Sequence, residues 1–465
     1  MQALQERWDI LAFFRRNQRP LHYLSTTIFN VLGADEWVHN LSFINTIDSF
    51  DGRHPRVFVA PSPPSLYLPR IEAANNYLLG HPAVADHMRL SGSGGALFMM
   101  FDAQAEALAQ KLGLAVVSPR NALRQHLDSK LTATRLAERA GVPSVPNVLA
   151  QVDSYRTLRE VARGLGPDLV VQLPFGDSGV TTYFVSNEAD FQRSADTIAQ
   201  QPEVKVMKRI RCRQTTLEGC IARCGTLVGP LMTELVGLPE LTPYGSGWCG
   251  NEVFGAGAST FISSDIRRQA QRAALAIGEQ LRQQGYWGCF GLDFLIDQDS
   301  GALYLSELNP RITGVTPLTM QTALDQQDLP LLLFHLLEWM GVEYAFDVEQ
   351  FNRRWVAAEQ TTSWSQLVIE HLGDEPATLT SALPAGVWRM QPDGRLLFSR
   401  TAFDPRAVAD ESEAFFLRTL DPGHTAYRGS SVGRLITHGR LLTDDYQLTE
   451  RARAWISGFR KLFVS

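Results

Sequence analysis

The stretch GLDFLIDQDSGALYLSELNPRITG, residues 291–314, decides the fold. Apolar residues recur on both sides of a polar, glycine-containing centre, which predicts two antiparallel strands around a turn. Asp293 lies on the first strand, and Glu307 and Asn309 lie on the second. Residues two apart on a strand project from the same face, so Glu307 and Asn309 point the same way.

The length of the turn decides which residue faces Asp293. A five-residue turn over 298–302 places Glu307 opposite it, whereas a four-residue turn without a bulge places Ser306 there. Facing carboxylates repel each other, and a divalent cation would offset the repulsion. Carboxylate and amide oxygens suit Mg²⁺, which usually also takes substrate phosphates. The alternative is that one carboxylate points to solvent or pairs with Arg311.

A glycine turn precedes this hairpin in the chain. LVVQLPFGDSGVTTYFV, residues 169–185, predicts strand, turn and strand. Gly176 and Gly179 permit positive φ, so the turn can present backbone N–H groups to phosphate oxygens. An ordinary hairpin tip accounts for the same residues.

Positive charge collects at two further places. A helix expected over about 128–140 carries Lys130, with Asp128 as its cap and Gly141 as its end. The second place is a cationic run that can meet a polyphosphate or form a solvated face; it contains Lys208, Arg209, Arg211 and Arg213.

Composition excludes several classes of protein. Of 465 residues, 45% are hydrophobic and 20% are charged, and the net charge is −6. These values describe neither a disordered chain nor a coiled coil, and they provide no global field that attracts nucleic acid or an anionic membrane. The cysteines are odd in number and central, which favours reduced thiols: Cys212, Cys220, Cys224, Cys249 and Cys289.

No stretch predicts a membrane span. The most apolar one, residues 329–340, contains Pro330, His335 and Glu338 and is shorter than the roughly 20 residues that a bilayer requires. The first residues carry charge too often for a signal peptide. We therefore expect a cytoplasmic protein.

The pattern of elements changes along the chain. Short apolar runs lie at 56–61, 96–101 and 114–118. A helical pattern over about 102–113 lies between the last two, which predicts a βαβ unit and a parallel sheet. Short strands dominate after Val145, a helix is expected over about 265–284, and β-rich material starts again at Glu343. The expected class is α/β and α+β, with several domains.

The order of these features resembles the ATP-grasp superfamily. DSKLTATRLAERAGVPSVP, residues 128–146, is similar to the start of the ATP-grasp module in biotin carboxylases and carboxylate–amine ligases. Residues 169–185 resemble the mobile phosphate flap of that family, and residues 291–314 resemble its metal hairpin. The resemblance covers about residues 95–340, and VGRLITHGRLL, residues 432–442, resembles more weakly the C-terminal lid of biotin carboxylases.

The resemblance implies three domains. They are an N-terminal α/β domain (1–125), a two-lobed ATP-grasp domain (126–342) and a β-rich, lid-like domain (343–465). Within the ATP-grasp domain, the flap lobe would span about 140–208 and the catalytic lobe about 209–342.

The resemblance also implies roles for individual residues. Lys130 would contact the ATP phosphates, and Gly176, Ser178 and Gly179 would cover the β- and γ-phosphates. The linker residues Lys208, Arg209 and Ile210 would contact adenine. Asp293, Glu307 and Asn309 would hold Mg²⁺, with two ions expected and Mn²⁺ as an alternative. Arg311 would face the transferred phosphoryl group or the substrate carboxylate.

The chain departs from the family pattern at three places. Gln172, which we expect beside the phosphates, stands where the family usually has a flap lysine. Lys208, Arg209 or Arg213 could supply the positive charge that this lysine would provide. Lys208 or Arg209 stands where the hinge usually has a glutamate. The glutamate-rich bicarbonate signature is missing after Arg311, where ITGVTPLTM follows, so biotin carboxylation is disfavoured.

The implied activity is that of an ADP-forming ligase that joins a carboxylate to an amine through an acyl phosphate. Its substrates would be small molecules, amino acids or a peptide, with no nucleic acid or membrane partner, and a homodimer would be compatible. The glycine-rich segment 241–260 would recognise substrate through Trp248 and Asn251, with an exposed loop as the alternative. Alternative functions are a non-catalytic ATP-binding regulatory module, a carboxylase or a phosphotransferase.

Overall fold

The computed structural model describes residues 4–464 apart from 62, 64, 65, 67, 69, 93, 177–180, 254–261, 359–362 and 381. Within these ranges the chain forms a five-stranded parallel sheet, a four-stranded antiparallel sheet and a ten-stranded antiparallel sheet, besides a two-stranded ribbon. The predicted class of α/β and α+β domains is confirmed.

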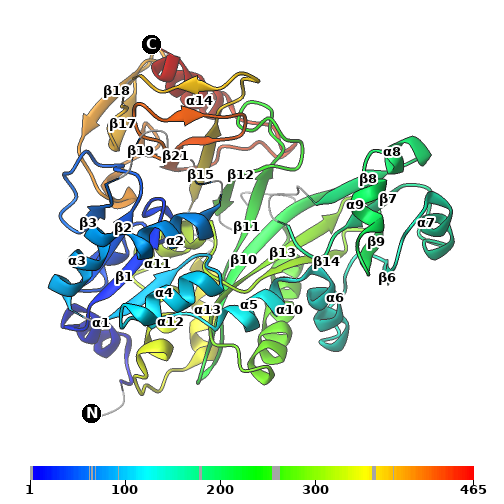
Figure 1. Ribbon diagram of the computed structural model, residues 1–465, viewed down its shortest axis with the longest axis horizontal. Coiled ribbons are helices and arrows are strands. Elements are labelled where there is room, and N and C mark those ends of the chain that lie inside the picture. Colours follow the sequence, from blue (N-terminus) through cyan, green and yellow to red (C-terminus); the bar gives the residue numbers. More distant parts are fainter. Residues whose placement is uncertain are drawn as a thin grey trace.

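The N-terminal domain is a parallel sheet between two layers of helices (Figure 1). Its strand order is β3-β2-β1-β4-β5, with β1 (Leu21–Ser25), β2 (Leu41–Asn45), β3 (Val57–Val59), β4 (Gly95–Phe98) and β5 (Ala115–Val116). Its helices are α1 (Arg7–Arg15), α2 (Ile71–Gly80), α3 (Pro82–Ser91), α4 (Ala103–Lys111) and α5 (Asn121–Asp128).

Alternate residues of β1 explain the two layers. Leu21 and Tyr23 belong to a core with α1 and a later helix, α12 (Leu331–Met340), while Leu24 packs with α2, α3 and α4. The strand order reverses between β1 and β4, and ligands of open α/β sheets bind outside the carboxyl ends of strands at such a point.

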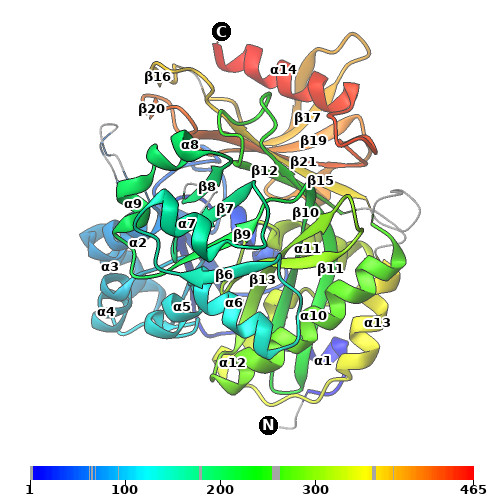
Figure 2. The same cartoon turned by 90° about the vertical axis from the view of Figure 1, so that its right-hand side faces the viewer.

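The flap lobe projects from the rest of the molecule (Figures 1 and 2). Its sheet has the order β6-β9-β7-β8, with β6 (Asn147–Ala150), β7 (Leu169–Gln172), β8 (Thr182–Val185) and β9 (Val204–Lys208). The helices of this lobe are α7 (Tyr155–Val161), α8 (Glu188–Gln192) and α9 (Ala195–Ala199). The preceding helix, α6 (Lys130–Arg139), packs in the core of the catalytic lobe.

The large sheet runs without interruption from the catalytic lobe into the C-terminal region (Figure 1). In spatial order its strands are β14 (Leu303–Asn309), β13 (Gly288–Asp297), β10 (Cys212–Ala222), β11 (Gly225–Val236), β12 (Trp248–Val253), β15 (Trp364–Glu370), β21 (Ser431–His438), β19 (Glu413–Arg418), β17 (Gly386–Met390) and β18 (Leu396–Arg400). The ribbon pairs β16 (Ala377–Thr378) with β20 (Thr425–Ala426). The boundary expected after residue 342 therefore falls within one continuous sheet, and the domain limits stay predictions.

Helices cover this sheet and place the hairpin of 291–309. They are α10 (Ser264–Gln283), α11 (Thr316–Asp325), α12, α13 (Val348–Ala358) and α14 (Glu450–Val464). One face of α10 packs with the hairpin residues Leu292 and Leu305 in a common core. None of the helices in the described ranges is both long and apolar enough to cross a bilayer.

The helix expected over about 128–140 is confirmed as α6, and Gly141 follows its end with positive φ. The expected cap was wrong, because Ser129 precedes α6 and Asp128 is the last residue of α5. Gly229 lies inside β11. The segment 427–442 contributes β21, which pairs with β15 and β19.

Candidate active site

The hairpin brings Asp293 and Glu307 face to face, by a route the sequence did not indicate. The Asp297 N–H donates to Ala302 O, so the turn has the shorter form, residues 298–301. Phe294 then pairs with Leu305, whereas Asp293 pairs with Glu307. A β-bulge at Ser306 supplies the extra residue between these two pairs. The facing pair is confirmed, and the five-residue turn is wrong.

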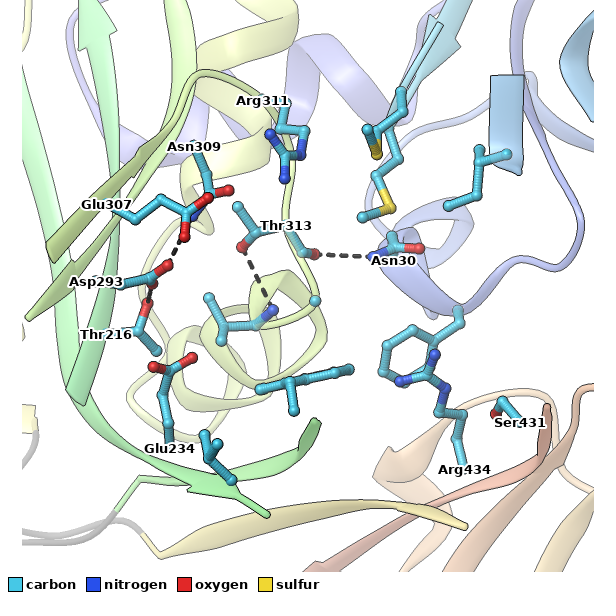
Figure 3. A pocket seen from close by; sticks show the side chains of 18 of the residues that line it. Asn30, Thr216, Glu234, Asp293, Glu307, Asn309, Arg311, Thr313, Ser431 and Arg434 are labelled. Carbon is cyan, nitrogen blue, oxygen red and sulfur yellow. Dashed lines mark hydrogen bonds between the residues drawn. The ribbon is translucent and has the colours of Figure 1, made fainter. Parts of the chain in front are cut away.

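Hydrogen bonds fix the carboxylates and the amide of this hairpin. The two carboxylate oxygens of Asp293 accept from Thr216 Oγ1 at 2.7 Å and from Asn309 Nδ2 at 2.8 Å (Figure 3). Glu307 Oε1 lies 3.1 Å from Lys130 Nζ. The hairpin therefore holds its oxygens in place before any ligand arrives.

The acidic groups of the site are electrostatically costly. Burial, followed by repulsion from Glu307, raises the pKa of Asp293 to about 6. Glu234 on β11 lines a cavity that Asp293 and Glu307 also line. Burial, together with repulsion from Asp293 and Glu307, raises the pKa of Glu234 well above the usual value. Sequence reasoning missed Glu234, because it is far from the hairpin in the chain and joins it only through the sheet.

Arg311 follows the hairpin and is held from one side. Its Nη1 pairs with Asp128 Oδ1, and Asp128 also receives Arg124 Nη1 at 3.4 Å. Arg311 lines the cavity, and its Nε has no hydrogen-bond partner among the described residues. Asp128, expected to be a helix cap, thus anchors this arginine through its Nη1 atom.

Lys130 connects the flap to the hairpin. This lysine is 4% exposed, and its Nζ donates to Gly176 O and to Glu307 Oε1. Gly176 has φ +140°, and an added Cβ would lie 2.1 Å from Thr181 Oγ1, so only glycine fits there. Ser178 and Gly179 lie outside the described residues.

Gln172 has a buried lysine as its direct neighbour in the flap sheet. Gln172 on β7 pairs with Lys205 on β9, so their side chains share one face. Lys205 is 2% exposed and has no ion pair within 4 Å among the described residues. Burial lowers the pKa of Lys205 to about 8, while Glu307 opposes the shift and Lys130 adds to it. Lys205 therefore lies near the same two groups that define the site.

The three cations that could have supplied the charge of the missing flap lysine are exposed or bonded to other groups. Lys208 and Arg209 are exposed, and the Arg209 guanidinium lies 5.0 Å from the Phe184 ring centroid. Arg213 Nη1 donates to Asp444 O at 2.7 Å. Unlike Lys205, none of these three side chains is buried in the flap sheet. A lysine inside an apolar strand run, VKVMK at 204–208, was the available signal for Lys205.

The linker expected to contact adenine lies where the flap lobe meets the catalytic lobe. The backbone N–H groups of Lys208 and Arg209 donate to Pro146 O and Asp168 O, so their carbonyls and side chains are what remain for a ligand. Ile210 is half-buried and packs beside Val170 and Met207.

A cavity of about 430 Å³ is lined by residues of the N-terminal domain, the catalytic lobe and the C-terminal region. Figure 3 shows Thr216, Glu234, Asp293, Glu307 and Asn309 on one wall, with Asn30, Ser431 and Arg434 across from them. The N-terminal domain contributes residues that follow the carboxyl ends of β1 and β4: Thr26, Thr27, Phe29, Asn30, Met99 and Met100.

Trp248 lines the cavity, whereas Asn251 lies behind it. Trp248 Nε1 donates to Asn251 Oδ1 at 2.9 Å, and Asn251 is fully buried outside the cavity lining. A Cβ on Gly314 would lie 2.8 Å from the Trp248 ring, so this glycine leaves room for the indole. The placement gives Asn251 the role of orienting Trp248 and does not support the expected direct contact with substrate.

The donor set fits Mg²⁺ bound partly by another molecule. Among the described residues, no group of three or more Asp, Glu, His or Cys side chains could hold a metal by itself. Two facing carboxylates and an amide oxygen suit a hard cation that keeps waters or takes phosphate oxygens as its other ligands. A cation would also relieve the repulsion that raises the pKa of Asp293.

Comparisons with known proteins show which fold this is. No family model matches the chain. The structure of a biotin carboxylase–β-γ-ATP complex from Campylobacter jejuni superposes with TM-score 0.62 and 13% identity, covering 90% of this chain and 87% of that one. An N5-carboxyaminoimidazole synthase from Aspergillus clavatus, in complex with ADP and its ribonucleotide, gives TM-score 0.58 and 11% identity over 96% and 98% of the chains. This chain has the ATP-grasp fold.

Sequence relatives of this ATP-grasp chain are distant. It is 24% identical over 266 residues to urea amidolyase of Saccharomyces cerevisiae, which is 56% of this chain and 13% of that protein. It is 25% identical over 230 residues to the [butirosin acyl-carrier protein]–L-glutamate ligase of Niallia circulans, which is 47% of this chain and 51% of that protein. The chain thus spans about half of one relative and a small part of the other.

Replacing Asp293 by Asn should stabilise the ligand-free protein at pH 8. A folded-state pKa raised to about 6 means that ionisation opposes folding as pH rises through the range between the unfolded and folded values. A pKa difference of about two between these states corresponds to roughly 3 kcal/mol, and the opening of the carboxyl to the cavity reduces this to about 1–2 kcal/mol. Denaturant unfolding at pH 8 and pH 5 measures the gain, which should shrink at pH 5.

Asp297→Asn is the matched control on the same strand. Hydrogen bonding from Ser300 lowers the pKa of Asp297, so this change should not stabilise the protein. Equal stability of wild type and Asp293→Asn at pH 8 would contradict the electrostatic description of the site.

Proposed function

We propose that the chain is an ATP-dependent, ADP-forming ligase that joins a small-molecule carboxylate to an amine through an acyl phosphate. The observation that carries the proposal is that the Asp293–Glu307 pair and Arg311 line one cavity, while Lys130 makes an ion pair with Glu307. The ATP-grasp fold and the relative named for L-glutamate ligation support it.

Different residues of the site would bind the phosphates, the cation and the substrate during phosphoryl transfer. Lys130 and Lys205 would contact ATP phosphates from the flap side, and Gly176 would bring the flap backbone close to them. Asp293, Glu307 and Asn309 would hold Mg²⁺, which supplies charge neutralisation to the phosphates. Arg311, already fixed by Asp128, would face the carboxylate or the phosphoryl group.

The second half-reaction needs a dry and oriented site. In the first half-reaction, a carboxylate oxygen attacks the γ-phosphorus and ADP leaves. In the second, the amine attacks the carbonyl carbon, the C–O bond breaks and phosphate leaves. Arg311 can stabilise the oxyanion that forms in between, and closure of the flap would keep water from the acyl phosphate.

Carboxylation is a second candidate, since two of the similar structures are a biotin carboxylase and a carboxyaminoimidazole synthase. Against it, ITGVTPLTM follows Arg311 where carboxylases carry the glutamate-rich signature. ADP release measured with a panel of carboxylates and amines, with and without bicarbonate, separates these functions. ATP binding with no ADP release under any condition would favour a regulatory module.

Glu307→Gln should lower turnover by about 10²-fold or more while the protein stays folded. The change removes charge at constant size, which weakens the cation site and the neutralisation of the transition state. Mg²⁺-dependent ADP release and thermal unfolding measure the two effects. Asp299→Asn, an exposed acid in the turn of the same hairpin, is the control and should behave like wild type. Near-normal turnover of Glu307→Gln would remove the metal assignment.

A charge exchange between β7 and β9 tests the role of Lys205. Lys205→Gln should weaken ATP binding by about tenfold, because a charge at about 4 Å is worth roughly 1–4 kcal/mol between water and a protein surface. Adding Gln172→Lys should restore the affinity, since these residues are direct cross-strand neighbours. Gln172→Lys alone places two like charges together and should lower the melting temperature. Isothermal titration calorimetry gives the affinities, and failure of the double variant to recover would contradict the assignment.

ATP affinity should fall above pH 8, because the pKa of Lys205 is lowered to about 8 and phosphate binding needs the protonated ammonium. Affinity should be level below that pH and decrease by up to about tenfold per pH unit above it. Calorimetry at pH 9 in two buffers of different ionisation enthalpy should detect proton uptake. Lys205→Gln should lose both the slope and the uptake; an unchanged slope would assign it to another group.

A further inference from the structure

Arg434 lies across the cavity from the hairpin and has no role in the reaction described above. It is on β21, between Val368 of β15 and Leu417 of β19. Figure 3 shows its guanidinium on the wall opposite Asp293 and Glu307. Arg434 is therefore a cation of the C-terminal region that lines a cavity shared with the catalytic lobe.

Two of the three guanidinium nitrogens of Arg434 are buried without a hydrogen-bond partner. Its Nε and Nη1 are inaccessible and have no hydrogen bond among the described residues. The nearest charged influence is Glu370, which acts on Arg434 electrostatically but makes no ion pair with it within 4 Å. Burial lowers the pKa of Arg434 to about 10, which is the sign of a cation that lacks compensation.

Neighbouring arginines of the same sheet are neutralised, which makes the contrast informative. Arg418 on β19 pairs with Asp51 and Asp421. Arg389 and Arg400 both pair with Glu413. A buried guanidinium without a carboxylate is costly, so an external anion is the natural complement of Arg434.

The residues around Arg434 fix the position of its guanidinium group. Its guanidinium lies 4.4 Å from the Phe29 ring centroid and 5.2 Å from that of Trp248, so two rings hold its plane. Trp248 is itself oriented by Asn251. The hydroxyl-bearing Ser431 and Thr419 line the same end of the cavity. A fixed guanidinium edge with hydroxyl groups beside it suits a carboxylate.

We propose that Arg434 binds the carboxylate of an α-amino acid, or of a peptide C-terminus, that serves as the amine acceptor. The carboxylate that becomes activated has to lie at the hairpin, beside the phosphates, so the anion at Arg434 belongs to another group. An acceptor anchored there would extend its amine toward the hairpin wall, which also carries the Glu234 carboxyl group. This inference rests on the proposed ligase function.

Paired ligands test the proposal on the unaltered protein. Each of the twenty common L-amino acids is compared with its α-amide, which keeps the amine and removes the carboxylate charge. Affinity is measured by thermal shift in the presence of Mg²⁺ and a nonhydrolysable ATP analogue. At least one acid should bind about tenfold or more tightly than its amide. No acid preferred over its amide would overturn the proposal.

Variants locate the preference at Arg434. Arg434→Met fits between the two rings and should make acid and amide bind equally weakly, with the affinity for the ATP analogue unchanged. Its melting temperature should be equal or higher, because an uncompensated buried charge is removed. Arg434→Lys should keep part of the preference. Arg428→Met, an exposed arginine before the same strand, is the matched control and should keep all of it.

The outcomes separate this proposal from the function on which it rests. Absence of ATP-analogue binding would remove the ligase proposal itself. ADP release supported equally by acids and amides would keep the ligase and overturn the role of Arg434. An acid preference that survives in Arg434→Met would also overturn the role of Arg434. If Arg434→Met instead lost affinity for a second carboxylate of the molecule that is activated by ATP, Arg434 would bind that molecule and not the amine acceptor.

Discussion

Repulsion between Asp293 and Glu307 is the interaction around which the rest of the site is arranged. The two carboxylates face each other because Ser306 bulges from β14, and burial makes their charges costly. Lys130 from α6, Lys205 from β9 and Arg311 from the end of the hairpin surround them. Each of these cations comes from a different element, so the packing of the flap lobe against the catalytic lobe determines how close the cations lie to the two carboxylates. Such a site costs stability without ligand, and in the proposed function a nucleotide and a cation would complete its charge balance.

The chain illustrates how position in space can replace position in sequence. Gln172 occupies the place where the family usually carries a flap lysine, yet a lysine lies directly across the strand pair. Cross-strand neighbours have their Cβ atoms about 5 Å apart, so either strand can supply a charge to the same volume. The loss at Gln172 is therefore weak support for a chain that only binds nucleotide, since the cationic surface of the flap is retained.

The sequence was informative where an element carried its own pattern. The hairpin of 291–309, the strand pair β7–β8, α10 and the parallel order of β4 and β5 were predicted because the signal lay within a short stretch. The bulge at Ser306 was not, since the same alternation suits two turn lengths. Lys205, Glu234, Asp128 and Arg434 were missed for a common reason. Their surroundings come from strands and helices that are distant in the chain. Glu234 and Arg434 line the cavity, whereas Lys205 lies near Glu307 and Asp128 pairs with Arg311.

The central claim is that a carboxylate oxygen attacks ATP and then leaves with phosphate. The most direct measurement supplies amino acids labelled with ¹⁸O in their carboxyl groups together with Mg²⁺ and ATP, and determines the mass of the phosphate that is released. The account predicts one ¹⁸O atom in each phosphate that accompanies ADP, because the C–O bond of the acyl phosphate breaks when the amine attacks. Product formation with unlabelled phosphate, or with AMP and pyrophosphate in place of ADP, would contradict it.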